Sequence, residues 1–172
     1  MGGIGSGRGL DPNEMETLEQ RVRDSLRDRV DAHKRNVFIS FSSDDLSEVN
    51  LLRAQARNQD SNINFNDWSL RKPFDSEAAD YIRRGIRERI RQSSVTVVYV
   101  SENTANSRWV DWEIRESLAM GKGVVAMHKG NTPPRRLPKA ITDNNISVVP
   151  WRQDRLANII ERESEKSQKR RS

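Results

Sequence analysis

The sequence predicts an α/β protein with a flavodoxin-like, three-layer fold: about five parallel strands in the order 2-1-3-4-5, with helices on both faces. Two observations predict this class. Short apolar runs alternate with helical patterns from residue 36 to residue 163. One of these runs, residues 95–100, has no polar alternation, which is typical of a central parallel strand that is covered on both faces. An additional helix is expected before this domain.

Composition places the core within part of the chain. The 172 residues are 34% hydrophobic and 32% charged, which is lean for a globular protein. The two ends of the chain account for the low hydrophobic content, because residues 1–9 are rich in glycine and residues 161–172 are almost wholly polar. We therefore expect a flexible Gly-rich N-terminus (1–12), an amphipathic N-terminal helix (13–35), one compact domain (36–163) and a basic flexible tail (164–172).

The residue inventory excludes several classes of function. The chain has no cysteine and only 2 histidines, so disulfides and thiolate metal sites are excluded and no metal site is expected. No apolar run is long enough for a membrane span and no signal-peptide core is present, which predicts a cytoplasmic protein without membrane partners. The net charge of +5 would permit nucleic-acid binding, but the basic residues are dispersed and we do not expect it.

The first predicted helix, over residues 13–33, carries one narrow apolar stripe. This stripe must pack on another surface, either the main domain or a second copy of the chain, and we favour the main domain. Its residues are Met15, Leu18, Val22, Leu26 and Val30.

The compact domain begins with a β-rich run at residues 37–41, followed by an acidic loop at 42–45 and a helix at 46–57. Residues 62–66 form a plausible second strand, although asparagine is a poor strand former. The loop after this strand, residues 67–76, contains Trp68, Pro73 and Phe74.

The central part of the domain has the clearest periodicity. Ile82, Ile86 and Ile90 recur every fourth residue and predict a helix over residues 77–92. The buried strand at 95–100 follows, and a loop then leads to the next helix.

That next helix should begin at Asn106 or Ser107, either of which is a good N-cap, and end at the glycines of residues 121–123. A fourth strand is expected at residues 124–127. The proline-rich residues 130–138 must be irregular.

The chain then closes the fold. A short fifth strand is expected at residues 146–149, and a last helix at residues 151–163.

Trp109 and Glu113 are the candidate functional pair. They are four residues apart on the predicted helix, so their side chains lie one above the other. An indole beside a carboxylate can stack on a flat ring while the acid handles a sugar or a proton. The alternative is structural: the indole anchors the helix to the sheet and Glu113 pairs with Arg115 or Lys122. The predicted fold favours a pocket here, because the loops at 40–45 and 101–106 reach the carboxyl edge of the sheet.

The motifs together resemble the TIR domain family. Residues 37–41 (VFISF) followed by Asp44 resemble its opening strand and acidic loop, and residues 93–101 (SSVTVVYVS) followed by Ser107-x-Trp109-x-x-x-Glu113 resemble its later core. The resemblance covers residues 36–151. It is closest to the bacterial TIR-like branch that includes the TIR-like subunit of Thoeris anti-phage systems.

This resemblance implies an NAD-consuming enzyme with NAD as substrate and no cofactor. Glu113 matches the glutamate on which NAD cleavage depends, where it would stabilise the oxocarbenium-like charge as the bond to nicotinamide breaks. The product would be ADP-ribose or a cyclic or conjugated form that signals to an effector protein. The resemblance also assigns side chains to the substrate pocket: Phe41, Ser42, Asp44, Trp68, Phe74 and Trp109.

The resemblance leaves the assembly and a second function open. The chain has no Gly-rich phosphate loop, and many TIR active sites form only when two domains stack, so we expect self-association and a phage-derived trigger. The alternative is a non-enzymatic TIR-like interaction module, because one fold supports many functions. A receiver-like phosphoacceptor is rejected, since Ser101 stands where an aspartate would follow the third strand.

Overall fold

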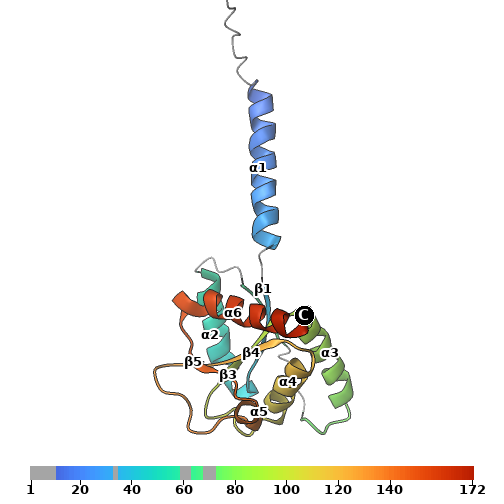
Figure 1. Cartoon of the computed structure of the whole chain (residues 1–172), viewed down its shortest axis with the longest axis vertical. Coiled ribbons are helices and arrows are strands. Elements are labelled where there is room, and N and C mark those ends of the chain that lie inside the picture. Colours follow the sequence, from blue (N-terminus) through green and yellow to red (C-terminus); the bar gives the residue numbers. More distant parts are fainter. Residues whose placement is uncertain (1–10, 33–34, 59–62, 68–72) are drawn as a thin grey trace, which may run out of the picture. The chain divides into compact units, whose positions relative to one another are not determined.

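The computed structural model describes residues 11–32, 35–58, 63–67 and 73–172, which form two compact units (Figure 1). The first unit contains α1 (Pro12–Ala32). The Asp11 side chain accepts the backbone N–H of Asn13 at 3.2 Å, and the Glu14 side chain accepts that of Asp11 at 3.1 Å. This capping box, with proline as the first helical residue, explains why the helix begins there. Whether its apolar stripe packs on the domain or on a second copy stays a prediction.

The second unit is built on one parallel sheet with the predicted strand order β2-β1-β3-β4-β5. Neighbouring strands are joined in parallel by helical crossovers, so all carboxyl ends lie at one edge of the sheet. The flavodoxin-like class is therefore confirmed. The strands are β1 (Arg35–Ser40), β2 (Ile63–Asn66), β3 (Val95–Val100), β4 (Gly123–His128) and β5 (Val148–Pro150).

Four helices and a 3-10 turn lie between the described strands, and a fifth helix follows the last strand. They are η1 (Ser43–Asp45), α2 (Leu46–Asn58), α3 (Ala79–Gln92), α4 (Arg108–Ala119), α5 (Lys139–Asp143) and α6 (Gln153–Arg171). Each strand places alternate side chains on opposite faces, so the two faces have separate cores. Helices α2 and α6 cover one face, and α3, α4 and α5 cover the other.

The face under α2 and α6 has a mainly apolar packing surface. Val37, Ile39 and Val97 from the strands meet Leu52 and Ile160 from the helices, and all are buried. The opposite face combines a cluster around Ile114 of α4 with a second cluster in which the α3 isoleucines cover Phe38. All six residues of β3 are buried, as its unbroken apolar run predicts.

The last helix extends beyond its predicted end at residue 163. Residues 164–172 were expected to be a flexible tail because they are polar, but α6 continues to Arg171 and buries Ser164 and Ser167. Small side chains allow this close approach. A Cβ atom on Gly123 would lie 2.4 Å from the backbone oxygen of Glu163, so a larger residue would not fit there.

The second difference is a short helix that the sequence analysis did not predict. Helix α5 follows the proline-rich segment and buries Ala140 and Ile141 against the α4 side of the sheet. No helix in the described part of the chain is long and apolar enough to cross a membrane.

Candidate active site

Glu113 of α4 is fully buried (0% exposed) against the carboxyl end of β1. The Ser40 hydroxyl, at the last position of that strand, donates a short hydrogen bond to Oε2 of Glu113. Ser40 pairs in register with Val98 of β3. Strands β1 and β3 flank the point where the strand order reverses, which is where open α/β sheets bind ligands. The carboxylate therefore lies at the position where open α/β sheets of this kind bind their ligands.

Local sequence explains the placement of α4. The Ser107 side chain accepts the backbone N–H of Val110 at 3.3 Å and caps the first turn, as predicted. Gly121 ends the helix with a φ of +69°, a left-handed conformation that favours glycine. Both ends of the helix are thus fixed by local chemistry, and Glu113 is held in the middle.

A second polar contact lies one turn further along α4. Ser117 Oγ donates to the backbone oxygen of Glu113 at 2.7 Å and lies 2.8 Å from Oγ1 of Thr96 on β3. Because the Ser117 hydroxyl has one hydrogen, Thr96 is the donor in the second bond. The four side chains of Ser40, Thr96, Glu113 and Ser117 form a buried polar seam between α4 and the sheet.

Trp109 lies one turn before Glu113 and is almost buried (7% exposed). Its ring meets Phe74 edge-on with centroids 4.8 Å apart, and Trp112 with centroids 6.0 Å apart. The guanidinium of Arg83 lies 4.4 Å from the Phe74 centroid, and Arg108 lies 4.5 Å from the same centroid. Cations over aromatic rings are attracted by the ring quadrupole. Phe74 is therefore held between Trp109 and two arginines.

A cavity of about 370 Å³ opens beside this aromatic cluster, at the first turn of α4. Phe74, Ser107, Arg108 and Trp112 contribute to its wall. Glu113 is not in the lining. The structure thus places a cavity next to Phe74 and Trp112, and the buried Glu113 carboxylate is not part of its wall.

A second buried carboxylate lies at the same edge of the sheet. Asp45 of η1 accepts hydrogen bonds from Ser101 Oγ at 2.5 Å and from Asn103 Nδ2 at 2.9 Å. These bonds join the loop after β1 to the loop after β3. They connect the two loops at this edge of the sheet, next to the candidate site.

Tyr99 adds a perturbed group near this second carboxylate. Burial, together with the negative charges of Glu48 and Asp45, raises the pKa of Tyr99 to about 12. Tyr99 and His128 also line a cavity of about 340 Å³ over the carboxyl ends of β3 and β4. In the described residues no group of three His, Cys, Asp or Glu side chains is placed to hold a metal ion.

The structure brings together some of the predicted site residues. Trp109, Glu113 and Phe74 lie in one region, and Phe41 and Ser42 are buried after β1. Asp44 is exposed on η1, because its neighbour Asp45 takes the buried position. Trp68 lies outside the described residues. The alternative surface ion pair of Glu113 is wrong: Arg115 pairs with Asp111 at 2.8 Å, and Lys122 donates to the Arg91 backbone.

Sequence reasoning did not identify Ser40, Thr96 or Asp45 as functional residues. Ser40 ends the apolar run of β1 and Thr96 lies within the apolar run of β3, and both hydroxyls contact side chains of α4. A hydroxyl at an apolar-strand position is the signal that would have found them, since buried polar groups need partners. The pairing with α4 itself depends on tertiary register.

Solved structures with a similar fold include a 2-deoxyribosyltransferase from the psychrotolerant bacterium Bacillus psychrosaccharolyticus, with 13% identity over 72% of this chain and 90% of that chain (TM-score 0.51). The TIR domains of the activated Roq1 resistosome align at 22% identity over 55% of this chain and 57% of that chain (TM-score 0.39). A putative pilus assembly-related protein from Burkholderia pseudomallei aligns at 11% identity over 77% and 91% (TM-score 0.45). The first match agrees with the fold described above.

Comparison with protein families identifies the sequence more closely. No curated protein matches the chain in a sequence search. A family model does match, over residues 38–133, which is more than half of the chain. The matched region runs from β1 past β4 and includes Ser40, Trp109 and Glu113. The chain therefore belongs to the family described as Thoeris protein ThsB, TIR-like domain.

Proposed function

We propose that this chain cleaves the bond between nicotinamide and ribose in NAD, as part of anti-phage defence. The observation that carries the proposal is the buried carboxylate of Glu113, which Ser40 holds at the reversal point of the sheet. Membership of the Thoeris TIR-like family supports the same reaction class. A carboxylate with no exposure is expensive to retain for packing alone, and such groups gather at functional sites.

The chemistry asked of Glu113 is electrostatic. As the C1′–N bond breaks, both bonding electrons leave with the nicotinamide nitrogen, and positive charge develops on the ribose. A carboxylate in a site that excludes water stabilises this charge far more than it would in bulk solvent. An oxygen of water, or a nucleophile of the same or a second molecule, then bonds to C1′. Ser40 acts as a positioning residue, because its hydroxyl fixes one carboxylate oxygen.

The burial of Glu113 sets a condition on this function. Substrate reaches the carboxylate only when a covering side chain moves, and Phe74 is the half-buried ring against Trp109. The cavity of about 370 Å³, which Phe74 and Trp112 line, would supply the entry space. An aromatic ring of the nucleotide would replace Phe74 as the stacking partner of Trp109.

We infer the wider role from the resemblance to the family. The ADP-ribose product, cyclic, conjugated or hydrolysed, would activate a separate effector protein, and a phage-derived trigger would start turnover. Self-association of TIR domains would complete the site, since the chain has no Gly-rich loop to hold the pyrophosphate.

The test is nicotinamide release from NAD by the purified full chain and by cells that express it, with and without phage infection. Products are identified by mass. Glu113→Gln should lose turnover, because the amide has the same shape and no charge. Glu116→Gln is the matched control: Glu116 lies on the same helix in an ion pair with Arg87 at 2.7 Å, so its loss should leave turnover unchanged.

Each outcome separates the two candidate functions. Turnover in the wild-type chain and in Glu116→Gln, but not in Glu113→Gln, supports the enzyme. Equal turnover in Glu113→Gln removes Glu113 from the reaction. A folded wild-type chain that releases no nicotinamide, before or after infection, contradicts the enzyme.

That last outcome would favour a non-enzymatic TIR-like assembly module. The observation that favours this second candidate is the packing of Trp109 among the buried residues that α3 contributes, where the indole has a structural role. Its signature would be concentration-dependent self-association that Glu113→Gln does not change.

A further inference from the structure

The amino edge of the sheet, opposite Glu113, carries a second cavity. It has a volume of about 250 Å³ and lies between the turn before β3, the turn before β4 and the end of α6. Three basic side chains line it: Arg91, Lys122 and Arg171. They come from three different elements, so the tertiary fold gathers them, and no local sequence run does so.

The basic side chains in this cavity are poorly compensated. Burial lowers the pKa of Lys122, and the positive charges of Arg171 and Arg91 lower it further. In the described part of the chain only Arg91 has a carboxylate partner here, the exposed Glu88 on its own helix. The cavity beside Trp112 differs, because there Arg115 pairs with Asp111 at 2.8 Å and Lys139 with Asp143 at 3.0 Å.

Backbone contacts hold two of these cations in place. Lys122 Nζ donates to the Arg91 backbone oxygen at 2.9 Å, and Arg171 Nε and Nη2 donate to the Gly121 oxygen at 3.0 and 2.7 Å. The latter bonds place a cation at the end of α4, which stabilises the helix dipole. That role explains Arg171, but it does not explain why Lys122 is drawn into the same space. The remaining N–H groups of both side chains stay available as donors.

Hydroxyl groups complete the wall of the cavity. Ser93, Ser164 and Ser167 are buried there, and Ser94 lies between Ser93 and the first residue of β3. Ser93 and Ser167 donate their single hydroxyl hydrogens to backbone oxygens at 2.8 Å, which leaves the hydroxyls of Ser94 and Ser164 as the donors in the wall. Cations with hydroxyl donors in a concave site are the groups that bind phosphate oxygens.

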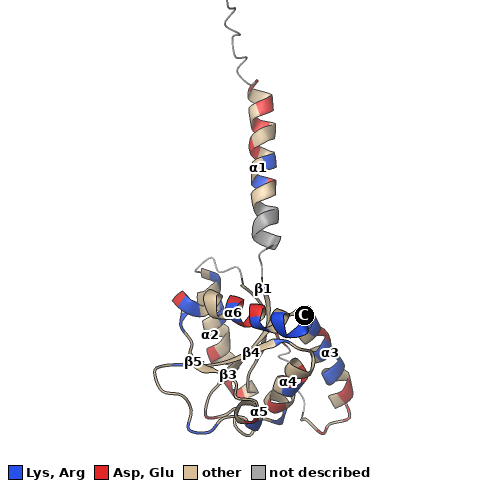
Figure 2. Cartoon of the chain, in the orientation of Figure 1, with Lys and Arg blue, Asp and Glu red and all other residues tan. Residues whose placement is uncertain are grey.

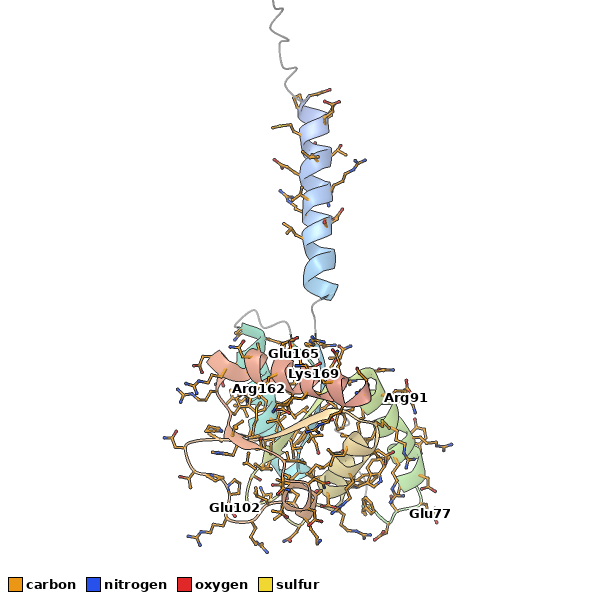
Figure 3. All side chains as sticks on the ribbon, in the orientation of Figure 1. Glu77, Arg91, Glu102, Arg162, Glu165 and Lys169 are labelled. Atoms are coloured by element: carbon orange, nitrogen blue, oxygen red, sulfur yellow. The ribbon has the colours of Figure 1, made fainter. Side chains whose placement is uncertain are left out.

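We propose that this cavity binds the phosphate groups of a small phosphorylated ligand. The cavity has no aromatic residue in its wall, so it offers no stacking surface for a base, and its size suits one or two phosphate groups. The cations that bound phosphate would neutralise include Lys122, whose pKa is lowered first by burial and then by the positive charges of Arg171 and Arg91. Figure 2 shows the positive charge at this end of α6, and Figure 3 labels Arg91 on α3 and Lys169 on α6.

The experiment is isothermal titration of the full chain with sodium pyrophosphate and with inorganic phosphate, at an ionic strength held constant with sodium chloride. Lys122→Gln and Arg171→Gln should each weaken pyrophosphate binding by about tenfold or more, the effect of losing one charge-assisted hydrogen bond. Lys122→Arg, which keeps the charge, should retain most of the wild-type affinity for pyrophosphate. Lys169→Gln is the matched control, because Lys169 is a cation of the same last turn that does not line the cavity.

The outcomes distinguish a specific anion-binding site from nonspecific electrostatic attraction of anions to a basic surface. Weak binding in Lys122→Gln and Arg171→Gln with normal binding in Lys169→Gln supports the proposal. No pyrophosphate binding by the wild-type chain overturns it, as does an equal loss in Lys169→Gln. Tight binding of a DNA duplex that all three variants weaken equally would also overturn it and would indicate a nucleic-acid surface. Unfolding midpoints without anion confirm that each variant is folded.

Discussion

The two helix layers that cover the sheet are built differently. Under α2 and α6 the strands present valine and isoleucine, and the interface is apolar. Under α4 the same strands present Ser40 and Thr96, which meet Glu113 and Ser117. Burying a carboxylate between a helix and a sheet stabilises the fold less than a hydrocarbon of the same size would. The comparison indicates that one layer serves stability and that the other gives up some stability to bury the polar side chains of the candidate site.

The largest expected effect is on the apolar layer. Ile160 is fully buried against the sheet, so Ile160→Ala should lower the free energy of unfolding by about 2–5 kcal/mol through lost burial and a cavity. Urea unfolding followed by circular dichroism measures this change. Nicotinamide release per folded molecule should stay as in the wild-type chain. A loss below about 1 kcal/mol would contradict the structural role assigned to this layer.

An intermediate effect is expected in the polar seam. Ser40→Ala removes the hydroxyl that Glu113 accepts, which should lower the free energy of unfolding by about 1–3 kcal/mol. Ser43→Ala is the control, since Ser43 is exposed on η1. A double-mutant cycle with Glu113→Gln should give a coupling of about 0.5–3 kcal/mol. Additive effects would show that the two side chains do not interact.

A smaller effect is expected at the first turn of α4. Ser107→Ala removes the N-cap and should lower the free energy of unfolding by about 1 kcal/mol. Ser107→Asp should restore it, because aspartate caps equally well and its charge favours the helix N-terminus. Thermal unfolding of the three chains tests this. A midpoint for Ser107→Asp below that of Ser107→Ala would contradict the capping role.

The smallest effect at neutral pH concerns Tyr99, the ionisable exception on the apolar face. The folded pKa of about 12 lies above the unfolded value of 10, so the folded state keeps the proton longer. Stability should therefore be unaffected below pH 10 and fall as the pH rises from about 10 toward 12. In Tyr81→Phe, ultraviolet titration should show one tyrosine with a midpoint near 12. In Tyr99→Phe the stability should no longer fall as the pH rises from about 10 toward 12. If the fall persists in this variant, another group causes it.

Local patterns predicted the fold well. The apolar run of β3, the isoleucine spacing of α3 and the cap at Ser107 each act over a few neighbouring residues, and the structure confirms all three. The strand order followed from the helical crossovers. These features need no knowledge of which distant residues touch.

The contacts of the site could not be predicted in the same way. Ser40 and Glu113 are 73 positions apart, and their meeting depends on how α4 lies across β1. Asp45 and Asn103 likewise join two loops that only the sheet brings together. Residues 164–171 were misread because composition suggested a tail, whereas Gly123 lets the backbone of α6 at Glu163 approach β4 closely and the helix continues to Arg171.

The ring cluster around Trp109 gives the molecule an optical reporter of its own. The chain has 4 tryptophans, and Trp109 and Trp112 lie 6.0 Å apart next to Phe74 and the guanidinium groups over it. Trp151 lies in the other core, against Phe65 and Tyr99. Any event that moves Phe74 away from Trp109 will expose Trp109 to water and shift its emission to longer wavelength. The emission of Trp151 will not change. Fluorescence of a chain with Trp68→Phe and Trp112→Phe, which keeps Trp109 and Trp151, would then follow the opening of the interface in real time, without an added label.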